Sequence, residues 1–253
     1  MANLTTLFPD SRYSISVSGG TQLSVLYVYN TNTSSVTNGG ICCGWTVPVG
    51  TSWARFDVWG GGGSGAGACC CQQPLQAGAS GSYTRKYTRV TPGEVYTVCA
   101  GGSGCCSTTC CGVCGYPSYV CNASATYPVC LCASGGCGGI SQCFLANNGC
   151  CPSLSCVTGT TCGGSLSMCG HFASDHGGGS CAFEHWHYVP GAPYKSSGVR
   201  VSRDSCGLLS GCQMMGDTPP LFPAGAGATS SVHGGACCWG QWGAGGMIQI
   251  TYR

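Results

Sequence analysis

Alternation of apolar and polar residues predicts strands near the start of the chain. Residues 13–18 and 22–29 both alternate with a period of two, the pattern of half-buried β-strands. Gly19-Gly20 between them predicts a two-residue hairpin turn. The second segment places four apolar residues on one face: Leu23, Val25, Tyr27 and Tyr29.

The same period continues through residues 45–59, which predict two short strands around a turn at Val49-Gly50-Thr51. In the second strand, two sets of three residues alternate between its faces. The first set is Ala54, Phe56 and Val58, and the second is Arg55, Asp57 and Trp59.

Three later segments complete a predicted β framework. Residues 82–90 alternate, Pro92-Gly93 predicts a turn, and residues 95–98 predict the strand that follows it. The closing residues, 243–253, predict a last strand of the same unit. Their β-branched and aromatic residues suit strands. The fold class predicted is all-β: an antiparallel β-sandwich framework with long glycine-rich, disulfide-stapled loops and almost no helix.

The middle of the chain loses this pattern. From residue 101 to 169 no run longer than four or five residues keeps either period, because Cys, Gly, Pro or Asn interrupts it. The composition explains the change, since the 253 residues include 45 Gly and 26 Cys and only 6% are charged. We expect ordered loops rather than linkers, because flexible linkers are not studded with cysteine and tryptophan. Each disulfide would stabilise such loops by roughly 2–4 kcal/mol.

The number of cysteines conflicts with the start of the chain. Residues 1–10 have neither the basic nor the apolar region of a signal peptide, which predicts synthesis in a cytosol, where disulfides do not persist. Either the cysteines bind metal, or the protein leaves its cell by lysis and oxidises afterwards. Cys111 and Cys114 have zinc-knuckle spacing, but a second knuckle does not follow clearly, so disulfides are favoured over zinc. Adjacent cysteines such as Cys42 and Cys43 are expected to reach different partners, and the connectivity stays open.

Charge and hydropathy exclude two classes of partner. The net charge is +2, and the densest basic patch, Arg85, Lys86 and Arg89, lies on an alternating strand rather than in a basic run. Nucleic-acid binding needs a concentrated positive surface, so it is not expected. No apolar stretch approaches the roughly 20 residues of a spanning helix, so membrane insertion is not expected either.

Aromatic residues and histidines gather late in the chain and form the candidate binding tip. Aromatic rings there could stack on sugar rings while imidazoles hydrogen-bond hydroxyl groups. One alternative is structural packing of the rings. Another is a metal site in which His185 and His187 are two ligands and His171, His176 or Glu184 is the third. No nucleophile elbow, carboxylate pair or phosphate loop is present, so we expect neither an enzyme nor a cofactor. The tip residues are His185, Trp186, His187, Tyr188, Trp239 and Trp242.

Five motifs occur in a recognisable order: WTVPVGT at 45–51, VWGGGGSGAG at 58–67, GSYTR at 81–85, VTPGEVYTVCAGGSG at 90–104 and WGAGGMIQITY at 242–252. This order resembles the glycine-rich domain of tail fibres and other virion proteins of tailed bacteriophages. The resemblance covers residues 41–104 and 234–253 and makes 105–233 a variable insert. The cysteine content departs from the family, in which glycine fills these loops. The resemblance implies a virion surface role, usually host attachment, often as a trimer.

These observations predict a virion structural protein, a tail-fibre or tail-tip component that attaches to a host surface glycan or protein. Residues 1–40 are expected to be a leader that binds other virion proteins, or else an edge hairpin of one domain, and residues 41–253 the glycine-rich domain. The expected location is the extracellular particle. The alternatives are a capsid or fibre decoration protein that does not bind the host, and a zinc-binding cysteine-rich module.

Overall fold

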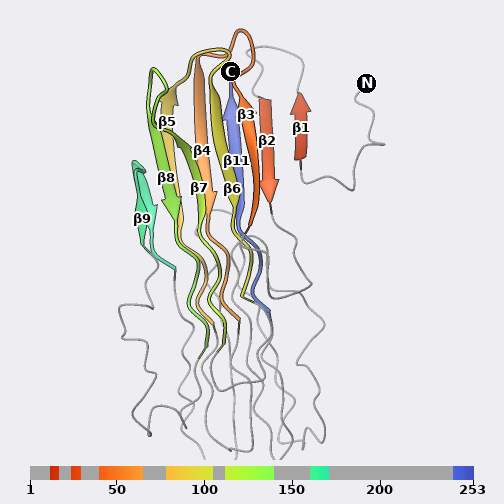
Figure 1. The fold of residues 1–253 in the computed structure, drawn as a ribbon, viewed down its shortest axis with the longest axis vertical. Coiled ribbons are helices and arrows are strands. Elements are labelled where there is room, and N and C mark those ends of the chain that lie inside the picture. Colours follow the sequence, from red (N-terminus) through yellow and green to blue (C-terminus); the bar gives the residue numbers. More distant parts are fainter. Residues whose placement is uncertain are drawn as a thin grey trace, which may run out of the picture.

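The fold is an all-β sandwich, as the sequence predicts. The computed structural model describes residues 12–16 (backbone alone), 24–29, 40–64, 78–104, 112–139, 160–170 and 242–253. Within these residues the chain forms eleven β-strands and no helix. The strands make two antiparallel sheets, which pack face to face in the upper part of Figure 1. None of these residues belongs to a helix that is long and apolar enough to cross a membrane.

The two sheets contain six and five of the described strands. The six-stranded sheet has the order β1-β2-β11-β4-β5-β10, and the five-stranded sheet has the order β3-β6-β7-β8-β9. The first consists of β1 (Arg12–Ser16), β2 (Ser24–Tyr29), β4 (Trp53–Trp59), β5 (Tyr83–Arg89), β10 (Leu166–Met168) and β11 (Met247–Tyr252). The second consists of β3 (Ile41–Thr46), β6 (Val95–Ala100), β7 (Ser118–Asn122), β8 (Val129–Ala133) and β9 (Thr161–Cys162).

Two tight turns carry the chain between the sheets, and both were predicted. Between β5 and β6 the Glu94 N–H donates to the Thr91 carbonyl (3.1 Å), and Gly93 between them has a φ of 87°. Because Pro92 precedes that glycine, the sequence suits a type II turn. Between β3 and β4 the chain turns at residues 48–51, with Gly50 at a φ of 85°. The strands that flank each turn therefore lie in different sheets rather than in one hairpin.

The core lies between the facing surfaces of the two sheets. Ala54, Phe56 and Val58 of β4 point into it and are at most 3% exposed, which confirms that they share one face of the strand. Trp45 of β3 packs edge-on against Phe56, with 5.7 Å between ring centroids. Tyr96 of β6 contacts both rings. These aromatic contacts join the two sheets.

The predicted leader contributes to the six-stranded sheet. β1 and β2 pair antiparallel, from Arg12 opposite Val28 to Ser16 opposite Ser24, and β2 pairs in turn with β11. Val28 is buried in the core, whereas Tyr27 and Tyr29 face the outer side of the sheet. The turn predicted at Gly19-Gly20 lies outside the described residues. The role of residues 1–40 in binding other virion proteins stays a prediction.

Four strands, β7 to β10, lie in the middle of the chain, where the sequence predicted no regular element. β7, β8 and the short β9 belong to the five-stranded sheet, with β9 at its edge. The short β10 lies at an edge of the six-stranded sheet. Val120, Val129, Leu131 and Ala133 alternate into the core, and each is fully buried. The alternation was missed because the outward positions hold Cys121, Cys130 and Cys132, which do not read as polar.

Below the sheets, in the lower part of Figure 1, extended glycine-rich segments continue the strands. Residues 60–64 run among the others, and their five successive N–H groups donate to carbonyl groups of different neighbours. The acceptors in order are Ser82, Tyr116, Ala244, Ala79 and Val113, at 2.7–2.9 Å. The first and fourth belong to segment 78–82, and the second and fifth to segment 112–117. Because this period of three is the repeat of a polyproline-II-like helix, the segments form a lattice rather than a sheet.

Glycine is required in this lattice because the backbones touch. A Cβ atom on Gly61 would meet the Gly102 carbonyl oxygen, and one on Gly136 would meet that of Ala79, both well inside 3.0 Å. We call the hydrogen-bonded segments 60–64, 78–82, 101–104, 112–117, 133–139 and 242–246 the glycine lattice. In these described segments the glycine-rich runs are ordered, as expected, rather than flexible linkers.

Candidate functional site

Most of the predicted binding tip lies outside the described residues. This applies to five of its six residues: His185, Trp186, His187, Tyr188 and Trp239. The sixth, Trp242, is half-buried where the chain enters the glycine lattice. The next residue, Gly243, donates its N–H to the Gly104 carbonyl (3.1 Å), which fixes this entry point.

The free end of the glycine lattice, which is the end away from the two sheets, holds ends of the long connections. Gly112 donates to the Gly139 carbonyl (2.7 Å), and Gly139 donates to the Ser64 carbonyl (2.8 Å), so three segments meet there. These residues adjoin the connections 65–77, 105–111 and 140–159. Trp242 closes the fourth connection, which contains residues 185–188. The sandwich and lattice therefore hold ends of all four connections at one place, opposite the turns at residues 48–51 (Figure 1).

A second candidate surface is the outer face of the six-stranded sheet. One row of five residues crosses five strands in register and is apolar throughout. In it Trp59 and Tyr83 are 2% and 1% exposed, with 5.0 Å between their ring centroids. The Trp59 indole Nε1 is buried without a hydrogen-bond partner in the part of the chain described. The row consists of Tyr29, Met247, Trp59, Tyr83 and Met168.

Next to this row lies a buried carboxylate, Asp57, which is 1% exposed. Its Oδ2 accepts a hydrogen bond from Arg55 Nε (2.7 Å), and its Oδ1 accepts from Arg85 Nε and from the Tyr83 hydroxyl (2.5 Å each). Burial and the bond to Asp57 raise the pKa of Tyr83, so this phenol stays protonated. Because its oxygens already have three donors, Asp57 acts here as a structural acceptor rather than as a general base.

The far end of this outer face is exposed and combines aromatic rings with guanidinium groups. Arg89 lies over the ring of Trp53, 5.4 Å from its centroid, and Arg55 lies 6.0 Å from the centroid of Tyr87. Trp53 is 42% exposed and Tyr87 is 58% exposed. Such rings can stack on a flat apolar ligand surface.

Sequence reasoning did not select these exposed rings. It placed Arg55 on the strand face opposite to Phe56, and Arg89 in an alternating strand, but it did not align the two strands. The observed register, with Trp53 opposite Arg89 and Arg55 opposite Tyr87, brings each ring to its guanidinium. The available signal was the aromatic residue at an outward position of each strand.

The described cysteines include one disulfide bond. Cys42 bonds Cys99 rather than its neighbour Cys43, as expected for adjacent cysteines. No group of three or more His, Cys, Asp or Glu side chains within the described ranges could hold a metal ion. Cys114 is exposed, and its predicted knuckle partner Cys111 lies outside those ranges.

Comparison with protein-family models gave no match, and comparison with curated proteins gave none either.

Proposed function

We propose that this protein is a virion surface component of a tailed bacteriophage that attaches the particle to the host envelope. The support is the glycine lattice, which extends a rigid sandwich and holds ends of four long connections at its free end. One of these connections carries the aromatic and histidine residues of the predicted tip. Function concentrates on loops that a rigid scaffold positions.

The sandwich fits the role of a base in this proposal. Its core joins two sheets through aromatic contacts, and its far end closes with two short turns. β1 and β2 lie at an edge of the six-stranded sheet, and in the proposal residues 1–40 make the contact to other virion proteins. We further propose a homotrimer, which native mass spectrometry tests by a mass three times the 25.5 kDa of one chain.

An adsorption competition tests the proposal. The purified full-length chain is added to host cells before the phage that encodes it, and free phage is counted over time. We expect the chain to slow adsorption in a saturable manner. A double variant, Trp186→Ala with Tyr188→Ala, should compete less well, whereas Val49→Ser, a 98% exposed position in the turn at the opposite end, should compete like the unchanged chain.

The competition also separates the alternatives. If the chain is found on purified particles but leaves adsorption unchanged at saturating concentration, it is a decoration protein and the attachment role is wrong. If the chain is absent from particles, the virion assignment fails. Elemental analysis of the purified chain addresses the third possibility, because one zinc or more per chain favours a zinc-binding module.

A further inference from the structure

The outer face of the five-stranded sheet carries three pairs of cysteines directly opposite each other. Cys42 faces Cys99 between β3 and β6, Cys121 faces Cys130 between β7 and β8, and Cys132 faces Cys162 between β8 and β9. One transverse row, Cys42, Cys99, Tyr119, Cys132 and Cys162, crosses all five strands of this sheet.

All three pairs point away from the core. Cys121 follows the buried Val120, and Cys130 and Cys132 flank the buried Leu131, so the strand pleat turns these sulfur atoms outward. Residues directly opposite on one face have Cβ atoms about 4.5–5.5 Å apart, and a disulfide needs about 3.5–4.5 Å. Small side-chain and backbone adjustments bridge that difference.

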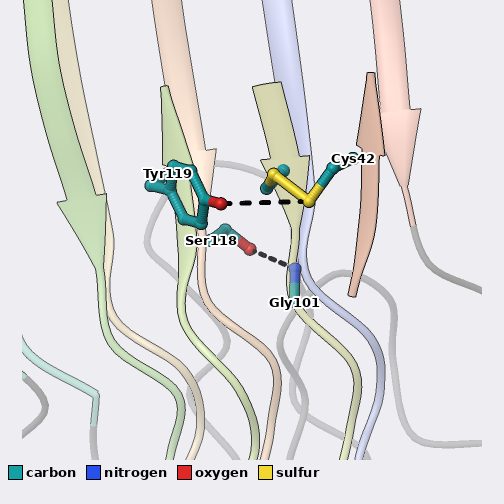
Figure 2. The surroundings of a disulfide bond; sticks show 5 residues. Cys42, Gly101, Ser118 and Tyr119 are labelled. Carbon is teal, nitrogen blue, oxygen red and sulfur yellow. Dashed lines mark hydrogen bonds between the residues drawn. A yellow bond between two sulfur atoms is a disulfide. The ribbon is translucent and has the colours of Figure 1, made fainter. Parts of the chain in front are cut away.

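The first pair is already bonded, and it provides a reference for the other two. Cys42 and Cys99 form a disulfide across a register position, with a Cα–Cα separation of 4.0 Å (Figure 2). The other four cysteines are thiols. Within each of the other two pairs the strand register places the two thiols directly opposite each other on the same face, as it does for Cys42 and Cys99.

We propose that Cys121–Cys130 and Cys132–Cys162 form two further disulfide bonds on the outer face of the five-stranded sheet. Each bond forms between two Sγ atoms with loss of both thiol protons and two electrons. The oxidant is a low-molecular-weight disulfide, such as glutathione disulfide, whose S–S bond breaks to give two thiols. This inference holds whether or not the chain is a virion component.

Exposure gives the order of the exchange. Cys130 and Cys162 are exposed, whereas Cys121 and Cys132 are partly buried. Burial, together with the neighbouring thiol, raises the pKa of Cys121 and of Cys132. The exposed member of each pair therefore attacks the oxidant first and forms the mixed disulfide, and its partner then displaces the small thiol.

The three bonds would link every neighbouring pair of strands in this sheet except β6 and β7. Across that remaining seam the Tyr119 hydroxyl contacts Cys42 Sγ at 3.9 Å, and the Ser118 hydroxyl accepts from the Gly101 N–H at 2.8 Å (Figure 2). The cross-links would thus hold β3 with β6 and, separately, β7 with β8 and β9.

Mass spectrometry of the full-length chain tests both bonds. The chain is incubated with glutathione disulfide, denatured, alkylated without reduction and digested with chymotrypsin. Residues 120–131 form one peptide, because Pro128 blocks cleavage after Tyr127. We expect this peptide to carry no alkyl group and to weigh two hydrogens less than its reduced form. We also expect peptides 132–144 and 155–166 to be linked, with fragmentation assigning the bond to Cys132 and Cys162.

Two substitutions sharpen the result. Cys130→Ser should make Cys121 fully alkylated while the Cys132–Cys162 link persists, and the matched control Cys169→Ser should leave both bonds intact. Alkylation of peptide 120–131 at both sulfur atoms in the unchanged chain would overturn the proposal for that pair. A link from Cys132 to any cysteine other than Cys162 would overturn it for the second pair.

Discussion

The glycine lattice makes a sharp prediction for the substitution Gly61→Ala. The added methyl group would lie well inside 3.0 Å of the Gly102 carbonyl oxygen, which is backbone and has no flexible end to move. Segment 101–104 must therefore shift away from segment 60–64.

The size of the effect follows from the hydrogen bonds that this shift breaks. Tyr116 donates to the Gly102 carbonyl (2.9 Å), Gly104 donates to the Gly62 carbonyl (2.8 Å), and Gly243 donates to the Gly104 carbonyl (3.1 Å). A buried backbone group left without its partner costs about 1–3 kcal/mol. Three such losses lower the free energy of unfolding by at least about 3 kcal/mol, out of the 5–15 kcal/mol typical of domains.

Thermal unfolding followed by circular dichroism measures this loss. For a chain of this length 1 kcal/mol corresponds to about 2–4 °C, so we expect Tm to fall by at least about 6 °C. The control is Gly44→Ala in β3, where the new Cβ would meet only the Val95 Cγ1 atom, at 3.3 Å. This substitution should change stability by less than about 1 kcal/mol. If Gly61→Ala melts at the same temperature as Gly44→Ala, the backbone contact in the lattice is wrong.

Three further predictions concern the sandwich. Asp57→Ala removes the acceptor of two arginines and of the Tyr83 hydroxyl, so urea unfolding should show a loss of about 3 kcal/mol, and a loss below about 1 kcal/mol contradicts this network. Cys42→Ser opens a loop with a sequence separation of 57 residues and should cost about 4 kcal/mol. Cys99→Ser should cost the same, and the double variant no more, because all three break one bond. Burial and the Glu94 charge raise the pKa of Tyr96 to about 12. The protonated phenol therefore contributes its full stabilisation at pH values below about 10, the ordinary pKa of tyrosine, and this contribution is lost as the pH rises from about 10 to about 12. Urea midpoints measured across this range should fall less for Tyr96→Phe.

The period-two pattern predicted the sandwich because half-buried strands show their two faces directly in the sequence. β4 and β5 were found this way, and so were both turns that contain Gly50 and Gly93. The pattern did not indicate which strands share a sheet. β3 and β4 are neighbours in the chain but belong to opposite sheets, because pairing over long sequence separations has no local signal.

The cysteines explain why β7 and β8 were not predicted. On β7 and β8 it occupies the outward positions, so the apolar inward residues were not distinguished from their neighbours by polarity. The candidate surface with Trp53 and Tyr87 was missed for a related reason, since it depends on the register between β4 and β5. The predicted tip at residues 185–188 stays a prediction.

The threefold lattice also determines how the protein responds to a pulling force. In a two-stranded hairpin the hydrogen bonds break one after another when the ends are pulled apart. Segment 60–64 instead bonds to three neighbours through its N–H groups, and its carbonyls accept from further segments, including 133–139 and 101–104. Tension along its axis therefore strains bonds to all these neighbours in shear at the same time. When a connection at the free end of the lattice is pulled, the hydrogen bonds that anchor its ends therefore share the load and do not open one after another.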